Sequence, residues 1–176
     1  AVKTLFGGDG RTGFDVENAD YILSFGSGFV DGWGSPVRMF KAASVWKEKN
    51  ITVVQVEPRL SNSAAKATRW VPVNPGTEAD LALGIAAAMV SRNMIDTGAV
   101  SGLSSWKSDL LAEYATEKVS QTTGVAAEVI AELAKGFASA NRPLALCGRG
   151  KAQTAGSLRY IAAVYALNAL AGNINQ

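Results

Sequence analysis

The chain has 176 residues, of which 48% are hydrophobic and 18% charged, and its net charge is +2. This composition is typical of a folded globular protein, and the length suits one well-cored domain. With no histidine and one cysteine, the chain excludes internal disulfides, zinc clusters, iron–sulfur clusters and histidine-based catalytic pairs. Scattered Lys and Arg residues exclude a basic stripe for nucleic acid. No apolar run approaches the ~20 residues of a membrane span, so direct membrane insertion is not expected.

The first part of the chain predicts two strands joined by a helix. The apolar run 21–25 predicts a buried strand, and the glycine-rich stretch 26–34 predicts a loop. A helix is predicted over 36–49, because Pro36 suits the first helical position. We expect this helix to turn one apolar set inward: Val37, Phe40, Ala43 and Val45. The β-branched run 51–56 predicts the second strand.

The second part predicts a short extended segment, several helices and one more strand. Residues 70–73 read as extended, but Pro72 disfavours a central position in a sheet. Helical periodicity predicts helices over 77–92, over 104–118, after a cap at Thr123, and over 157–171. A strand is predicted over 143–147. The alternation of strands and helices predicts an α/β fold with three αβα layers, a Rossmann-like, mostly parallel sheet covered by helices on both faces.

Gly26, Ser27 and Gly28 directly follow the first predicted strand. Glycines let backbone N–H groups approach a phosphate, and the N-terminus of the following helix adds positive potential. A dinucleotide fingerprint, GxGxxG, would need glycine at position 31, where this chain has Asp31. The loop is therefore either a ligand contact or simply a glycine-rich turn.

Two acidic residues stand where further ligand contacts are expected. Glu57 ends the second strand, where a carboxylate can accept hydrogen bonds from a ribose or a base edge. Its alternative role is an ion pair with Arg59 or a cap for the next turn. Residues 75–78, Pro-Gly-Thr-Glu, open a helix whose N–H groups can bind an anion. Glu78 there also complements the helix dipole without any ligand.

Gly148, Arg149 and Lys151 follow the last predicted strand and suit an anionic group, although they lack the spacing of a P-loop. Cys147, just before them, is expected to be a small buried hydrophobe. The carboxyl ends of parallel strands lie at one edge of a sheet, which is where ligands bind in open α/β folds. We therefore expect residues 26–28, 57–59 and 76–78 to surround one cleft.

Several segments resemble, in the same order and spacing, molybdopterin oxidoreductases of the dimethyl sulfoxide reductase type. These segments are 17–26 (ENADYILSFG), 56–61 (VEPRLS), 65–73 (AKATRWVPV), 75–82 (PGTEADLA) and 167–174 (LNALAGNI). The resemblance covers nearly the whole chain. It implies the Rossmann-like third domain of that family, which holds one of two molybdopterin guanine dinucleotides.

The resemblance also assigns residues by position. It implies cofactor contact after the first strand by Gly26, Ser27 and Gly28. It places Glu57, Pro58 and Arg59 near the guanosine. Gly76, Thr77 and Glu78 are placed near the guanosine as well. It brings Gly148, Arg149 and Lys151 towards the pterin. The family often has Asn at position 28 and Asp at position 57, and the loss of that Asn removes one side-chain hydrogen bond to the cofactor.

The family's metal-binding side chain and cluster cysteines lie outside such a domain, so no molybdenum ligand and no catalytic residue is expected here. The resemblance implies a two-electron bacterial oxidoreductase, such as a polysulfide, thiosulfate or quinone-linked reductase. Two alternatives stay open. One is a cofactor-free structural or electron-transfer scaffold, as in the molybdopterin-like subunits of membrane quinone-reducing complexes. The other is a self-standing nucleotide-binding enzyme.

The chain starts at Ala1 without Met and stops directly after a helical pattern. We therefore expect residues 1–176 to be a single domain of a larger protein that is inactive alone. The expected partners are the remaining domains of the parent chain, together with iron–sulfur and membrane subunits, and any iron–sulfur clusters belong to those other segments. The expected location is the periplasmic side of a bacterial membrane, and the alternative is the cytoplasm.

Overall fold

A single parallel sheet organises the part of the chain that the computed structural model describes, residues 13–95, 103–148 and 157–174. Its four strands there are β1 (Tyr21–Phe25), β2 (Thr52–Val56), β3 (Arg69–Val71) and β4 (Pro143–Cys147), in the order β3-β2-β1-β4. Phe25 pairs with Val56 on one side and Cys147 on the other, and Val56 pairs with Val71. All four strands therefore end in step at one carboxyl edge, which we call the rim.

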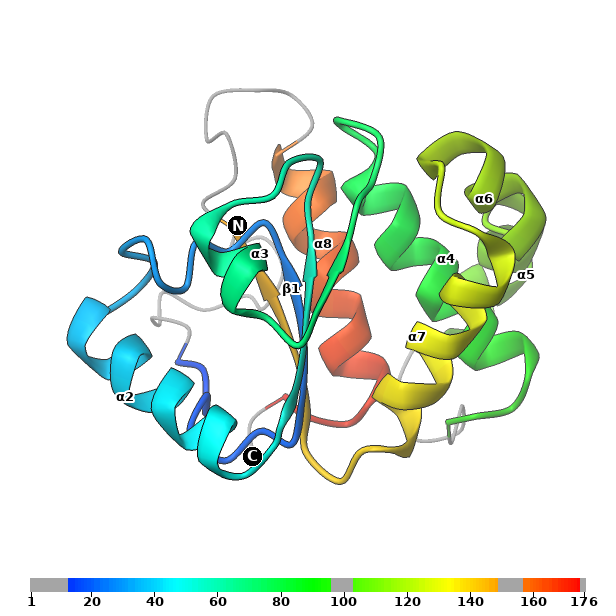
Figure 1. The fold of residues 1–176 in the computed structure, drawn as a ribbon. Coiled ribbons are helices and arrows are strands. Elements are labelled where there is room, and N and C mark those ends of the chain that lie inside the picture. Colours follow the sequence, from blue (N-terminus) through cyan, green and yellow to red (C-terminus); the bar gives the residue numbers. More distant parts are fainter. Residues whose placement is uncertain (1–12, 96–102, 149–156, 175–176) are drawn as a thin grey trace.

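Helices cover both faces of the sheet, which confirms the predicted three-layer αβα class (Figure 1). On one face lie α2 (Pro36–Glu48) and α3 (Asn62–Lys66). On the other lie α4 (Glu78–Ser91), α7 (Ala127–Ser139) and α8 (Ser157–Leu170), with α5 (Leu103–Glu113) and α6 (Thr116–Thr123) beyond α4. None of the helices in the described part of the chain is long and apolar enough to cross a membrane.

Alternating side chains of the strands supply two apolar cores, one on each face. Leu23 and Phe25 of β1 pack with residues of α4, α7 and α8, whereas Ile22 packs with residues of α2. A sheet buried on both faces needs mostly apolar side chains, and the buried positions of β1 and β2 are apolar except for Ser24 and Gln55. β3 is an edge strand, in agreement with the position that Pro72 predicted.

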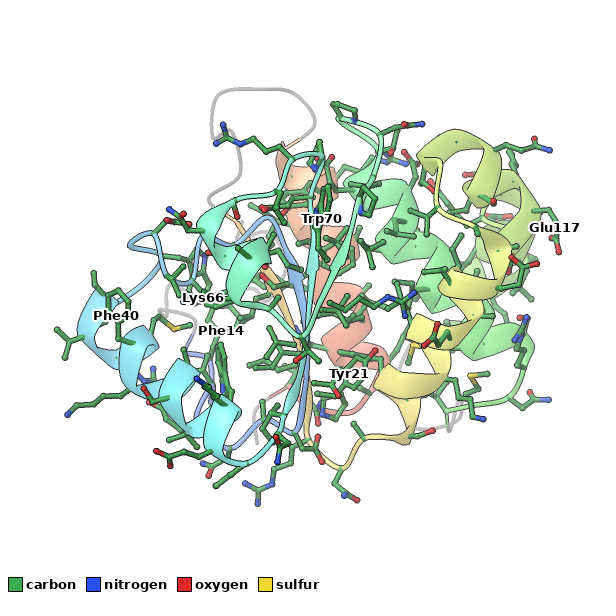
Figure 2. The ribbon with its side chains drawn as sticks, viewed as in Figure 1. Phe14, Tyr21, Phe40, Lys66, Trp70 and Glu117 are labelled. Carbon is green, nitrogen blue, oxygen red and sulfur yellow. The ribbon has the colours of Figure 1, made fainter. Side chains whose placement is uncertain are left out.

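The predicted inward face of α2 is wrong. Met39, Ala42 and Trp46 are the buried residues of this helix, while Val37 and Phe40 are 69% and 56% exposed. Figure 2 shows Phe40 on the outer side of α2, pointing away from the sheet. The Trp46 indole N–H donates to the carbonyl oxygen of Val16 at 2.7 Å inside the second core, and this buried bond fixes which side of α2 faces inward.

The predicted helix over 104–118 is also wrong, because the backbone turns at Ala115 (φ −55°, ψ 140°) and separates α5 from α6. Thr123 does not cap the following helix. It is the last residue of α6, and its hydroxyl donates to the carbonyl oxygen of Val119 at 2.7 Å. Gly124 (φ +74°) then ends α6 in the left-handed conformation that glycine adopts readily.

Candidate functional site

The rim brings the glycine loop and the end of the last strand into direct contact. The Gly26 amide donates to the carbonyl oxygen of Val56 at 2.9 Å, and the Gly148 amide donates to that of Phe25 at 2.8 Å. A Cβ added at Gly148 would lie 2.3 Å from the Gly26 carbonyl oxygen. Gly26 itself has φ +59°. Glycine at 148 therefore lets the two main chains pack directly against each other, and glycine suits the left-handed conformation at 26.

Tyr160 of α8 fastens these two strand ends together. Its hydroxyl accepts a hydrogen bond from the Gly148 amide at 3.2 Å and donates one to the Phe25 carbonyl oxygen. The added Cβ of a residue at position 26 would lie 3.7 Å from the same hydroxyl. Tyr160 thus borders the contact between Gly26 and Gly148 on the side of the sheet that α4 and α8 cover.

The acidic groups predicted for the site lie within electrostatic reach of Tyr160. Burial raises the pKa of the Tyr160 phenol above its usual value, the hydrogen bond from Gly148 opposes the rise, and negative charge at Cys147, Glu78 and Glu57 adds to it. Glu57 follows β2 and Glu78 opens α4.

Glu57 is held by donors from within the chain. Its Oε1 accepts from the Ser61 amide at 3.0 Å and its Oε2 accepts from Gln55 Nε2 at 3.0 Å, while Trp70 Nε1 donates to its backbone carbonyl at 3.0 Å. Glu57 therefore caps the turn before α3, which is the local role that the sequence left open. A carboxylate has about four lone-pair positions, so two positions stay available to a ligand.

The loop before α4 reaches the same end of the sheet (Figure 1). Gly76 has φ +86°, which favours glycine, and Thr77 occupies the N-cap position. The Thr77 hydroxyl donates to the carbonyl oxygen of Asn74 at 2.8 Å and makes no cap hydrogen bond. Glu78 and Asp80 stand in the first turn of α4, where negative charge complements the helix dipole.

The other predicted site residues have fewer contacts within the chain, or lie outside the described residues. Pro58 and Arg59 are exposed next to Glu57, and Gly28 lies 3.2 Å, measured from an added Cβ, from the Cβ of Asp31. Arg149 and Lys151 lie outside the described residues. Cys147 is buried as expected, and burial raises the pKa of its thiol, which opposes a nucleophilic role. Among the described residues, no group of three or more acidic, cysteine or histidine side chains could hold a metal.

Tyr160 and Gln55, among the residues that the structure describes, belong to the rim but were missed by the sequence analysis. Gln55 is a polar residue within an otherwise apolar strand, TVVQV, and this break in the pattern was a usable signal. Tyr160 lies in a helix rich in apolar residues and reads as a core residue, so the sequence carried no comparable signal.

A polar cleft lies between α4, α5 and α6 and contains none of the predicted site residues. Arg159 of α8 borders it, donating to Asp80 at 2.5 Å and to the Tyr114 hydroxyl at 3.0 Å. The lining residues are Asp80, Glu113, Tyr114, Lys118, Val119 and Thr122.

Comparison with known proteins matches residues 5–176 to the family model of molybdopterin oxidoreductases. The chain is 34% identical over 178 residues to the menaquinone reductase, molybdopterin-binding-like subunit of Nitratidesulfovibrio vulgaris, covering 98% of this chain and 25% of that protein. It is 32% identical over 200 residues to the arsenate respiratory reductase molybdopterin-containing subunit of Shewanella sp. strain ANA-3, covering 97% of this chain and 23% of that protein. The chain thus spans about a quarter of the length of these relatives.

A solved structure shows the same fold. Acetylene hydratase from Pelobacter acetylenicus superposes with a TM-score of 0.78 at 22% sequence identity, over 91% of this chain and 22% of that one. This likeness shows the arrangement of strands and helices, and it agrees with the three-layer architecture described above.

Proposed function

This chain belongs to the molybdopterin oxidoreductase family, and we propose that it holds one end of a molybdopterin guanine dinucleotide within a larger oxidoreductase. The observation that carries the proposal is the meeting of three strand ends at one rim, with Gly26 after β1, Glu57 after β2 and Gly148 after β4. In open α/β sheets, ligands bind beyond the carboxyl ends of the strands.

Each predicted group has a distinct task in this proposal. Residues 26–28 contact the cofactor after β1, residues 57–59 and 76–78 contact the guanosine, and residues 148–151 contact the part near the pterin. The free lone pairs of Glu57 accept hydrogen bonds from N–H or O–H groups of the nucleotide. When bound, the cofactor supplies two-electron redox chemistry at its metal, whereas this chain supplies binding and orientation.

The activity of the whole protein forms part of the same proposal. We infer a reductase whose electron relays and substrate pocket lie in other segments or subunits, on the periplasmic side of a bacterial membrane. Relatives described as menaquinone reductase, thiosulfate reductase and dimethyl sulfoxide reductase components support a respiratory reductase. By itself, the 176-residue chain is expected to be inactive, because metal ligands are not among its proposed site residues.

A second candidate function is a scaffold that keeps the fold without the cofactor. Two observations favour it: both Glu57 carboxylate oxygens already accept internal hydrogen bonds, and the Gly148 amide is shared between Phe25 and Tyr160. The relative from Nitratidesulfovibrio vulgaris is itself described as molybdopterin-binding-like. Mass spectrometry of the denatured full-length protein separates the two candidates, because guanine dinucleotide and molybdenum support the first and their joint absence supports the scaffold.

The contact with Glu57 is tested by titrating GMP into the chain and into Glu57→Ala. Loss of a buried hydrogen bond to the base should weaken binding by roughly 1–3 kcal/mol, or about 5- to 150-fold in Kd. Glu48→Ala is the matched control, because Glu48 is an exposed glutamate on α2. Equal GMP affinity of Glu57→Ala and the unmodified chain would reduce Glu57 to its local capping role.

A further inference from the structure

We propose that Gln55 is a positioning residue that sets the orientation of the Glu57 carboxylate and of the Ser27 backbone at the rim. This inference rests on the proposed function, because both groups belong to the proposed nucleotide site. Gln55 itself is fully buried at 0% exposure, so it acts through these neighbours.

The Gln55 amide joins two segments that are far apart in sequence. Its Nε2 donates to the Ser27 carbonyl oxygen at 3.2 Å and to Glu57 Oε2 at 3.0 Å. Both partners are acceptors, so the nitrogen of the amide must face them and the side chain cannot be flipped. One buried amide thus connects the loop after β1 with the acid after β2.

Stability alone does not explain a glutamine at this position. The amide oxygen of Gln55 has no hydrogen-bond partner among the described residues, and an unpaired buried acceptor is unfavourable. Val53 and Val56 of the same strand are buried and apolar, as a strand covered on both faces requires. The amide oxygen of Gln55 is unpaired, so we infer that the side chain serves the two hydrogen bonds that its nitrogen donates to Ser27 and Glu57.

A separate set of contacts already fastens the loop to α3. Asp31 accepts from Asn62 Nδ2 at 2.9 Å and from the Ser63 hydroxyl at 3.0 Å, and the Val30 amide donates to Ser63 Oγ at 3.2 Å. These contacts hold residues 30 and 31, whereas Gln55 contacts Ser27, which lies closer to the end of β1. The specific contribution of Gln55 is orientation: with the Ser61 amide, it supplies one donor to each oxygen of Glu57.

This arrangement has a consequence for the ligand. Gln55 and the Ser61 amide hold the Glu57 carboxylate in one orientation. The remaining lone pairs of its oxygens therefore point in fixed directions. A ligand edge that carries N–H or O–H donors in matching positions is then favoured over one that carries acceptors. Gln55 thereby sets the direction from which an N–H or O–H group of a nucleotide can reach Glu57.

The first test needs no ligand. Gln55→Met keeps the length of the side chain and removes the amide, and Gln121→Met makes the same change at an exposed position of α6. In Gln55→Met, we expect the amide of Ser61 to exchange with solvent about tenfold faster, because its acceptor on Glu57 is no longer held. NMR signals of residues 26–28 and 57–61 should shift together. Unchanged exchange at Ser61 in a folded Gln55→Met chain overturns the inference.

The second test measures GMP binding in a double-mutant cycle. We expect Gln55→Met to weaken binding about tenfold in the unmodified chain and to have no further effect in Glu57→Ala. Independent, additive losses overturn the inference. Absence of GMP binding to the unmodified chain contradicts the proposed function, while the exchange measurement still decides the role of Gln55.

A variant of Glu57 keeps the inference testable if Gln55→Met does not fold. In the unmodified chain, the Gln55 side-chain amide protons should exchange slowly, because they are buried and bonded. In Glu57→Ala their signals should shift and exchange faster. Signals that stay the same in Glu57→Ala overturn the inference.

Discussion

Replacing Gly148 with alanine tests the close approach at the rim. The new methyl carbon would lie 2.3 Å from the carbonyl oxygen of Gly26 and 2.9 Å from its carbonyl carbon. Because real contacts of this kind stay above 3.0 Å, the two strand ends must separate by at least 0.7 Å. Both colliding atoms belong to the backbone, so no side-chain rotation relieves the contact.

The expected loss of stability has two parts. Overpacking of this kind costs about 1–3 kcal/mol. Separation of the strand ends also weakens the bond from the Gly148 amide to Phe25 and the bond to Tyr160, each contributing about 1 kcal/mol. We therefore predict that Gly148→Ala lowers the free energy of unfolding by roughly 2–4 kcal/mol.

Urea unfolding followed by far-ultraviolet circular dichroism measures this difference. Gly13→Ala is the control, because a Cβ there meets nothing within 4 Å. The control should stay within about 0.5 kcal/mol of the unmodified chain. A Gly148→Ala chain as stable as the control would refute the close packing of Gly26 and Gly148.

Two further substitutions test the packing behind the sheet and the response to pH. A Cβ at Gly84 of α4 would lie 2.6 Å from Cγ1 of the buried Val119, so Gly84→Ala should lower stability by about 1 kcal/mol despite the better helix propensity of alanine. In a Val119→Ala background the same change should stabilise, and destabilisation in both backgrounds by urea unfolding would contradict this packing. Burial raises the pKa of Tyr21 to about 12 from 10.0, with Glu132 adding to the rise and Arg69 opposing it. The neutral phenol thus favours the folded state fully below pH 10, and this contribution is lost as the pH rises from about 10 to about 12. The stability difference between the unmodified chain and Tyr21→Phe should therefore be smaller at pH 11 than at pH 9, and equal differences would show that Tyr21 titrates normally.

The strands and the rim could be predicted because their signals are local. Apolar, β-branched runs marked β1, β2 and β4, and their alternation with helices required parallel pairing. Once strands are parallel, their carboxyl ends must lie on one edge. The sequence therefore predicted a shared edge for Gly26 and Glu57, whereas the position of β4 beside β1, which brings Gly148 against Gly26, was not predicted.

The errors arose where tertiary contacts decide between equivalent local choices. α2 carries apolar residues on two sides, and the packing of Met39 and Trp46 in the second core, together with the bond from Trp46 to Val16, selects the buried side. The turn at Ala115 has no glycine or proline to mark it. It lets Val119 of α6 reach Gly84 of α4, a contact that a sequence pattern does not reveal.

The details of the site were the least predictable part. Glu57 was expected to face a ligand or to cap a turn, and the hydrogen bond to Ser61 establishes the second role without removing the first. Tyr160 and Gln55 act through side chains that cross between elements, and such contacts depend on the complete packing of the sheet and helices. The alternation of strands and helices therefore predicts which segments share an edge of the sheet, but not which side chains hold them.

The most direct test of the central claim is a map of the amide signals of the isotope-labelled chain during titration with GMP. If the strand ends form one nucleotide site, signals from residues 26–28, 57–59 and 76–78 should shift together with a single dissociation constant. Signals that shift in only one of these segments, or with different dissociation constants, would contradict a common site at the rim.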